Sequence, residues 1–381
     1  MMDLTLNRLK KDDFQELVTL LNTVFSAHNG QEMDFEGMFP RIFVPEDETM
    51  GWHLGAKAEG RLLGVAASYP ITYRVGGTEL KISAGGNVAV DASVRGQGIM
   101  QSLLNRLDEE DRAAGFDISY LHGDRFRYRN FGYERCGMEC DFTLTRQMLG
   151  KDAPQRKFTY VNLLEADDAV IKNAFDFHSS RSRIVRDFAS FMPAMRAKQR
   201  LPLAVLDEED AMIACFTVCP VSHTIGEILL CDSALFSDVI KGYMHQYGVN
   251  RLRLGLPVYD PLVRQAQAVA DRYVIMQPGN FKIFNFKRVV ESFMREKMQY
   301  TALPDGVVTV CSEVLGAWRI EKQKEAVTVS PHSGKAQYTL PGYSIYPFLF
   351  GTLAPAQQVN PEEDALLKAW FPLPLYCPYL T

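Results

Sequence analysis

One stretch carries the clearest structural signal of the chain, Gly86-Asn-Val-Ala-Val-Asp-Ala-Ser-Val-Arg-Gly-Gln-Gly-Ile-Met-Gln-Ser-Leu-Leu-Asn-Arg-Leu107. Its order of residues predicts a strand, a tight glycine turn and the start of a helix. The first turn of a helix leaves backbone N–H groups unpaired, and here they would point at one spot where a pyrophosphate can sit. The stretch therefore predicts a site for a phosphate-bearing ligand, although a plain strand-to-helix turn would look the same.

Length and composition place the chain among globular proteins of two or three domains. It has 381 residues, of which 47% are hydrophobic and 23% charged, and both values are ordinary for a soluble fold. The net charge of −5 argues against nucleic acid as a main partner, because phosphate backbones need a basic face. No apolar run approaches the length that spans a bilayer, so we expect no membrane partner.

The cysteines and the first residues favour a cytoplasmic protein with reduced thiols. The chain has seven cysteines, an odd number, and its first residues do not resemble a signal peptide. The pairs Cys136/Cys140 and Cys215/Cys219 are not followed by His or Cys pairs at zinc-site spacing. We therefore predict no metal site.

The pattern of elements predicts α/β architecture in three domains, at 1–150, 151–285 and 286–381. In the first domain we expect strands on both sides of a central helix that begins at the glycine turn, a short helix at 125–130 and a closing strand at 140–146. The second domain repeats this order without a second glycine turn. The third combines an amphipathic helix near 287–298, strands, further helices and an apolar, proline-rich end that we expect to be docked.

The glycine turn resembles the acetyl-CoA fingerprint of the GCN5-related N-acetyltransferases (GNAT), Arg/Gln-x-x-Gly-x-Gly/Ala. Met100 stands where that family has a small residue. The resemblance implies that acetyl-CoA is the cosubstrate, bound by the glycine turn, the strand before it and the turn after the next strand. The residues it implies are Val88, Ala89 and Val90 through their backbones, Arg95, Gly96, Gln97, Gly98, Ile99, Met100 and Gln101, and Gly123 and Asp124.

A second motif, Phe126-Arg-Tyr-Arg-Asn-Phe-Gly-Tyr133, resembles the Tyr-x-x-x-Gly-Phe/Tyr segment of the same family. There a tyrosine returns a proton to the CoA thiolate, and Tyr128 occupies its position. A phenol with a pKa of about 10 is protonated at neutral pH, as a proton donor must be, while a thiol titrates at about 8.5. The alternative for Tyr128 is simple aromatic packing.

The whole chain resembles the bacterial Eis-like family, named for enhanced intracellular survival. That resemblance implies two GNAT-like mixed-sheet domains, the second degenerate, followed by an α+β domain like sterol carrier protein 2 (SCP2). It also implies a homo-oligomer, a hexamer, and a general base formed by the terminal carboxylate, here Thr381. His122 and Asp124 are competing candidates for the base, and Thr381 is otherwise only the end of the sequence.

The acidic segment 32–48 is either a solvated loop or a wall that attracts a cationic amine. The resemblance favours the second interpretation for at least one residue, with Asp34 and Glu36 as the first candidates for substrate binding. The chain is therefore predicted to be an acyltransferase of EC class 2.3.1. It would move an acetyl group to a primary amine of the aminoglycoside, polyamine or lysine type by direct attack. The alternative is a non-catalytic acyl-CoA sensor or lipid carrier.

Overall fold

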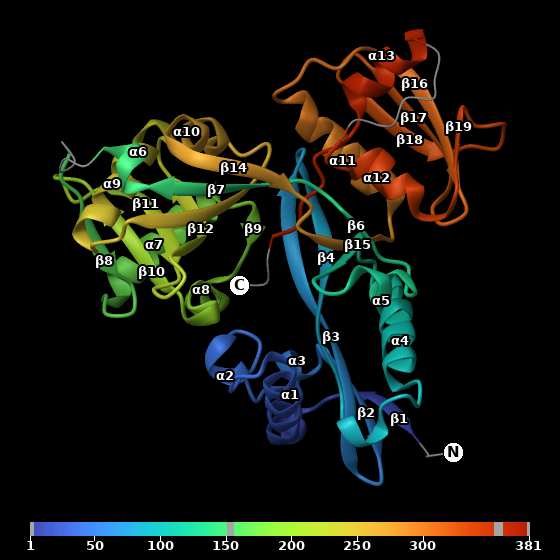
Figure 1. Cartoon of the computed structure of the whole chain (residues 1–381), viewed down its shortest axis with the longest axis horizontal. Coiled ribbons are helices and arrows are strands. Elements are labelled where there is room, and N and C mark those ends of the chain that lie inside the picture. Colours follow the sequence, from blue (N-terminus) through green and yellow to red (C-terminus); the bar gives the residue numbers. More distant parts are fainter. Residues whose placement is uncertain (1–3, 151–155, 354–360, 379–381) are drawn as a thin grey trace. The chain divides into compact units, whose positions relative to one another are not determined.

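The computed structural model describes residues 4–150, 156–353 and 361–378, and these form two compact units (Figure 1). The first unit holds the described residues within 1–36, 42–138 and 277–380, and the second those within 37–41 and 139–276. Each is built around its own mixed sheet. The two units are described in turn.

The sheet of the first unit has the order β1-β2-β3-β4-β5-β15-β6. Its described neighbours pair antiparallel, apart from β4 and β5, which run parallel. A parallel pair needs a crossover connection, and the central helix α4 supplies it. The strands are β1 (Thr5–Arg8), β2 (His53–Ala58), β3 (Arg61–Val75), β4 (Thr78–Val90), β5 (Ile118–Leu121), β15 (Gly279–Ile283) and β6 (Glu134–Cys136).

Two long helices cover opposite sides of β2–β4 (Figure 1). The helices are α1 (Phe14–Asn29) and α4 (Ile99–Ala113), with the short helices α2 (Phe35–Met38), α3 (Asp47–Met50) and α5 (Arg125–Arg129) beside them. In α4, leucines at helical spacing, Leu103, Leu104 and Leu107, are buried against the sheet. The helix ends at Ala113, and Gly115 two residues later has a φ of +74°, the left-handed value that favours glycine there. The predicted strand, turn and helix are confirmed.

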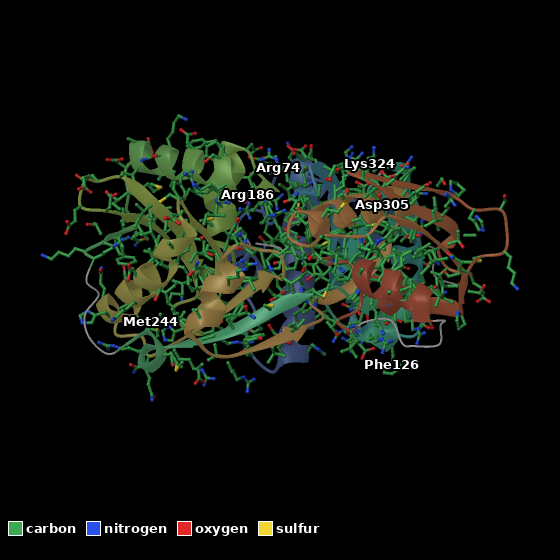
Figure 2. All side chains as sticks on the ribbon, turned by 90° about the horizontal axis from the view of Figure 1, so that it is seen from above. Arg74, Phe126, Arg186, Met244, Asp305 and Lys324 are labelled. Carbon is green, nitrogen blue, oxygen red and sulfur yellow. The ribbon has the colours of Figure 1, made fainter. Side chains whose placement is uncertain are left out.

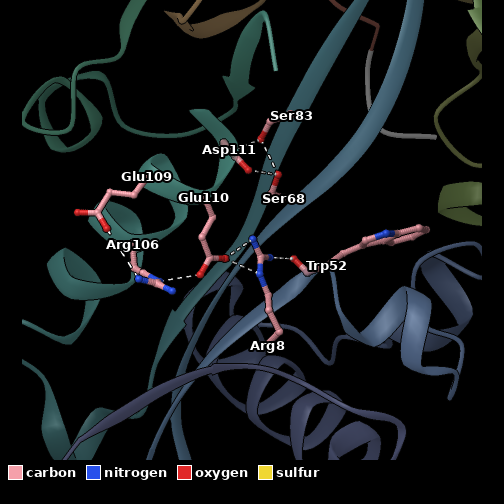
Figure 3. Close-up of polar contacts among 8 residues, drawn as sticks. All are labelled: Arg8, Trp52, Ser68, Ser83, Arg106, Glu109, Glu110 and Asp111. Atoms are coloured by element: carbon pink, nitrogen blue, oxygen red, sulfur yellow. Dashed lines mark hydrogen bonds and ion pairs between the residues drawn. The ribbon is translucent and has the colours of Figure 1, made fainter. Parts of the chain in front are cut away.

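Polar contacts fix α4 to the sheet (Figure 3). Asp111 accepts hydrogen bonds from Ser68 of β3 at 2.8 Å and from Ser83 of β4 at 2.5 Å. The preceding residue, Glu110, pairs with Arg8 of β1 at 2.7 Å. A buried carboxylate held by two hydroxyl donors has its hydrogen-bonding needs met, so it sets the position of the helix without the cost of an unpaired charge.

The sheet of the second unit has the order β14-β7-β13-β12-β11-β10-β8, again with one described parallel pair, β12 and β13. The elements are β7 (Glu139–Thr145), α6 (Arg146–Leu149), β8 (Thr159–Asn162), α7 (Asp168–Arg181), β9 (Ile184–Val185), α8 (Phe188–Met195), β10 (Leu201–Leu206), β11 (Met212–Val218), β12 (Thr224–Leu230), α9 (Phe236–Gln246), β13 (Arg251–Pro257), α10 (Leu262–Val269) and β14 (Ala270–Met276). Read from β8 to β14, this order repeats that of the first unit from β1 to β6. The repeated topology agrees with the prediction of a second copy.

The two sheets exchange one strand. We expected the strand at 140–146 to close the first sheet, and this is wrong: β7 pairs with β13 and β14 of the second unit. Its place beside β5 in the first unit is taken by β15, which comes from the far side of the second unit in sequence. Both strands are short and mix apolar with polar residues, and nothing local in their sequences specifies a partner. The three predicted domain boundaries stay a prediction.

The remainder of the first unit is an α+β portion. It contains α11 (Phe286–Met298), β16 (Gly306–Ser312), β17 (Gly316–Gln323), β18 (Ala326–Pro331), β19 (Tyr338–Leu340), α12 (Ile345–Phe350) and α13 (Pro361–Trp370), with the sheet order β18-β17-β16-β19. The segment after α13 is docked as expected: Leu373 and Leu375 are buried, and the Leu375 carbonyl accepts from the Met138 amide at 2.8 Å. None of the helices within the described ranges is long and apolar enough to cross a bilayer.

Candidate acyl-CoA site

The parallel strands β4 and β5 separate at their ends. Their pairing runs from Ile82↔Ile118 to Gly85↔Leu121 and stops there, whereas β4 stays paired with β3 as far as Val90. Main-chain groups of β4 beyond Gly85 are thus no longer bonded to β5. Ligands in open α/β sheets bind where neighbouring strands part, and these groups include the stretch 88–90 that was predicted to bind acetyl-CoA.

The glycine turn lies at the start of α4, beside this opening. Gly96 and Gly98 have φ values of +80° and +78°, and Gly98 is the N-cap residue, with no side chain capping the helix. A Cβ on either glycine would meet no described atom within 4 Å, so backbone conformation and not packing requires glycine here. Residues 95–98 are exposed. The turn that leads into α4 is thus open to solvent, as phosphate binding requires.

Met100, which departs from the fingerprint, has a structural explanation. Its side chain packs against the buried cluster between α4 and the sheet. The close approach of helix and sheet is made instead at Gly64 of β3, where a Cβ would lie 2.9 Å from Ile99. Met100 therefore belongs to the core side of α4, and its size is no obstacle to a ligand at the glycine turn.

The corresponding turn of the second unit lacks glycine. Between β12 and α9, Asp232 accepts a hydrogen bond from the Ala234 amide at 2.9 Å, as Asp91 does from the Ser93 amide in the first unit, but residues 231–235 contain no glycine. The residue before α9 is Leu235 in a right-handed conformation, so the left-handed turn that Gly98 makes before α4 is absent here. The second unit thus repeats the fold without the phosphate-binding turn.

Tyr128 lies on α5 with 7% of its surface exposed. Its ring packs on Gly123, where a Cβ would come within 2.5 Å of Cε2, and it meets Tyr133 edge-on at 6.2 Å between ring centroids. Burial raises the pKa of the Tyr128 phenol. The group is therefore kept in the protonated form that a proton donor needs, and both predicted interpretations, aromatic packing and proton donor, fit this geometry.

The turn before α5 is shaped by its own polar groups. Asp124 caps α5 by accepting from the Arg127 amide at 2.7 Å, which gives this carboxylate a structural task. His122 is exposed, and its Nε2 lies 2.7 Å from the Tyr120 hydroxyl. Phe126 lies on the surface of α5 with 76% of its area exposed (Figure 2). The two candidate bases of this turn, His122 and Asp124, are therefore both exposed to solvent.

Two side chains of the exchanged strand β15 hold both ends of the Tyr128 segment. Asn280, fully buried, donates from Nδ2 to the Gly123 carbonyl at 3.1 Å. Lys282 donates from Nζ to the Phe131 carbonyl at 2.8 Å and pairs with Asp108 of α4 at 2.5 Å. A strand from beyond the second unit in sequence therefore positions the predicted proton donor. Sequence reasoning missed both residues.

The remaining predicted residues are not brought to this opening by anything the structure describes. Asp34 and Glu36 are exposed at and beside α2, whose Phe35 is buried against Phe25 and Phe43. Thr381 lies outside the described residues. Within residues 4–150, 156–353 and 361–378 there is no group of three or more His, Cys, Asp or Glu side chains that could hold a metal ion.

Comparisons with known proteins agree with the first unit's architecture. Residues 5–136 match the family model of the acetyltransferase (GNAT) domain, which places such a domain in the first third of the chain. No curated protein matches the sequence.

Solved structures share the fold over nearly the whole chain. A GCN5-related N-acetyltransferase from Kribbella flavida is 15% identical with a TM-score of 0.68, covering 97% of this chain and 96% of its own. One from Anabaena variabilis is 16% identical with a TM-score of 0.66, covering 98% of each chain. Eis1 from Mycobacterium abscessus is 14% identical with a TM-score of 0.63, covering 98% of each. These likenesses establish the fold.

Proposed function

We propose that the chain is an acetyl-CoA-dependent N-acetyltransferase that acts on a primary amine. The observation that carries the proposal is the combination of the opening between β4 and β5 with the uncapped glycine turn and the buried Tyr128. The residues present fit acetyl-CoA as cosubstrate. The first-turn N–H groups suit its pyrophosphate, and the unpaired main-chain groups of β4 suit the amides of its pantetheine arm.

The reaction we propose is direct attack of a neutral amine on the thioester carbonyl. As negative charge develops on the carbonyl oxygen, a backbone N–H of residues 88–90 donates a hydrogen bond to it. The bond between carbon and sulfur then breaks, and Tyr128 donates its proton to the departing thiolate. The raised pKa of Tyr128 keeps that proton available across the neutral range.

We further propose that the terminal carboxylate of Thr381 takes the proton from the attacking amine, and that Asp34 and Glu36 attract the cationic form of the substrate. The exposure of both acidic residues supports the second role. Extending the chain beyond Thr381 by a short tag tests the first. Activity should fall by orders of magnitude, and a fully active tagged protein would remove Thr381 from the mechanism.

The proposed activity is tested by CoA release from acetyl-CoA with a panel of aminoglycosides, polyamines and lysine peptides. We expect turnover with at least one amine class and mass-spectrometric detection of the acetylated product. Tight acetyl-CoA binding without turnover on any amine would overturn the enzyme proposal and leave the acyl-CoA sensor or lipid carrier. The α+β portion after residue 286, which we propose to be SCP2-like, would then be the part to test with lipids.

We also propose a cytoplasmic homo-oligomer, a hexamer. The free state of all seven cysteines is consistent with a reducing compartment. On the second unit, the edge strand β14 exposes 39–48% of each of four consecutive apolar residues, Tyr273 to Met276, which is a surface that association would protect. Sedimentation at several concentrations should give six chains; a monomer throughout would contradict the proposal.

A further inference from the structure

A hydrogen-bond network of polar side chains, with His53 and Tyr69 buried and Asn87 partly buried, runs from α3 through β2 and β3 to the far part of β4. Nδ1 of His53 lies 3.2 Å from the Thr49 carbonyl, and Nε2 of the same ring lies 3.0 Å from the Tyr69 hydroxyl. Asn87 donates from Nδ2 to that hydroxyl at 2.5 Å. His53 and Tyr69 are essentially inaccessible to solvent. Neither His53 nor Tyr69 belongs to the motifs that predicted the site, and Asn87 lies in the opening stretch without having been assigned a role.

The hydrogen bonds of this network have a fixed direction. Burial lowers the pKa of His53 to about 4, so the ring is neutral and carries one proton at neutral pH. A carbonyl can only accept, which places that proton on Nδ1 and leaves Nε2 as an acceptor. Tyr69 must then donate to Nε2, and its oxygen accepts from Asn87. Every donor points from β4 toward α3, and the network ends at the Thr49 carbonyl, which cannot release or take up a proton.

Asn87 lies at an irregularity in β4. Ala67 pairs with Gly86 and Val65 with Ala89, so Asn87 and Val88 together oppose Ala66 alone, which is a β-bulge. The φ of Asn87 is +52°, a left-handed conformation that is costly for a residue with a Cβ and that asparagine tolerates better than most. The bulge lies just after the last pair with β5, Gly85↔Leu121. It therefore determines where the main-chain groups of residues 88–90 point.

We propose that Tyr69 and His53 are positioning residues that hold Asn87 in its left-handed conformation and thereby aim the 88–90 backbone at the acyl carbonyl. The inference rests on the proposed function for its catalytic part, but not for its backbone part. The side-chain anchor offsets the backbone cost of the left-handed conformation, which would otherwise favour a regular strand. Without the anchor, the bulge can relax and the N–H donor loses its alignment.

Four variants test this. Tyr69→Phe removes the hydroxyl and keeps the ring. Asn87→Ala removes the anchor and disfavours the positive φ, whereas Asn87→Gly removes the anchor but permits that φ. Tyr73→Phe is the matched control, since it removes a hydroxyl from a buried tyrosine on the same face of β3. Steady-state kinetics give kcat and KM, and amide hydrogen exchange of residues 87–90 needs no amine substrate.

We expect kcat to fall about 10- to 100-fold in Tyr69→Phe and Asn87→Ala, less in Asn87→Gly, with KM for acetyl-CoA changed by less than about 3-fold. The shape of the pH profile should stay that of the unmodified protein. Exchange at residues 87–90 should be about 10-fold faster in Tyr69→Phe than in Tyr73→Phe.

Unchanged exchange, or equal effects of the two tyrosine substitutions, would overturn the positioning role. A displaced pH profile in Tyr69→Phe would also overturn the positioning role, because it would show that the hydrogen-bond network relays protons. If exchange responds as expected but the unmodified protein turns over no amine, the proposed function fails and the backbone assignment stands.

Discussion

The buried His53 predicts a specific loss of stability in acid. Burial lowers its pKa to about 4, with the nearby Arg8 cation acting in the same direction and hydrogen bonds to the Thr49 and Met50 carbonyls opposing it. The unfolded chain would bind a proton with a pKa near 6.5. The unfolded state binds the proton more tightly than the folded state. His53 therefore makes its full contribution to the free energy of unfolding above about pH 6.5, and this contribution is lost as the pH falls toward about 4.

The magnitude follows from the difference between the two pKa values. A difference of about 2.5 pH units corresponds to roughly 3 kcal/mol when the loss is complete, and to about 2 kcal/mol between about pH 7.5 and pH 5. His53→Gln removes the titrating group and retains a polar side chain. Over that interval, the free energy of unfolding of this variant should therefore fall by about 2 kcal/mol less than that of the unmodified protein.

Urea unfolding followed by tryptophan fluorescence is the suitable assay, since Trp52, Trp318 and Trp370 all lie in the first unit. His28→Gln, at an exposed histidine of α1, is the matched control and should keep the full pH dependence. The same slope in His53→Gln as in the unmodified protein would refute the neutral buried ring and, with it, the direction of the hydrogen bonds to Tyr69.

Three further predictions concern single residues. Gly98→Ala should weaken acetyl-CoA binding about 5- to 30-fold by disturbing a left-handed turn, while Gly115→Ala, with a similar φ at the other end of α4, should cost stability and leave the dissociation constant unchanged. Equal binding by both variants in calorimetry would contradict the phosphate site. Gly76→Ala should lose about 3 kcal/mol or more of unfolding free energy, since its Cβ would lie 2.0 Å from a carbonyl of α11, against about 1 kcal/mol for Gly77→Ala, whose Cβ meets open space. Similar urea midpoints for the two would contradict the close contact between the β3–β4 turn and α11, where the Gly76 amide also donates to Glu296 at 2.8 Å. Asn280→Ala should lower kcat about 10-fold at nearly constant acetyl-CoA affinity; an unaltered kcat would remove β15 from the positioning of Tyr128.

Local signals in the sequence were sufficient for the glycine turn, α4 and the segment around Tyr128. In these stretches the periodicity, the glycines with positive φ and the helix start are all encoded within a few residues of one another. The presence of strands along each half was also predictable, because alternating apolar residues mark a strand wherever it pairs. The same signal says nothing of the partner, and so the exchange of β7 and β15 was missed.

Residues that act across the fold were not predictable. Asn280 reaches Gly123 across 157 positions, and before folding it is one asparagine in a short strand. Tyr69 lies 16 positions from His53 and 18 from Asn87, and in sequence each is an ordinary member of a strand. The contact of Tyr69 with His53 and Asn87 has a positioning role only because β4 forms a bulge, and that bulge results from a register shift against β3.

The most direct test compares CoA release by the unmodified protein and by Tyr128→Phe with a saturating amine, alongside the dissociation constant of acetyl-CoA. We expect kcat to fall by about 10²-fold or more, because the ring still packs on Gly123 but holds no proton for the thiolate, while acetyl-CoA binds with unchanged affinity. A kcat equal to that of the unmodified protein would contradict the assignment of Tyr128 as the acid of this site.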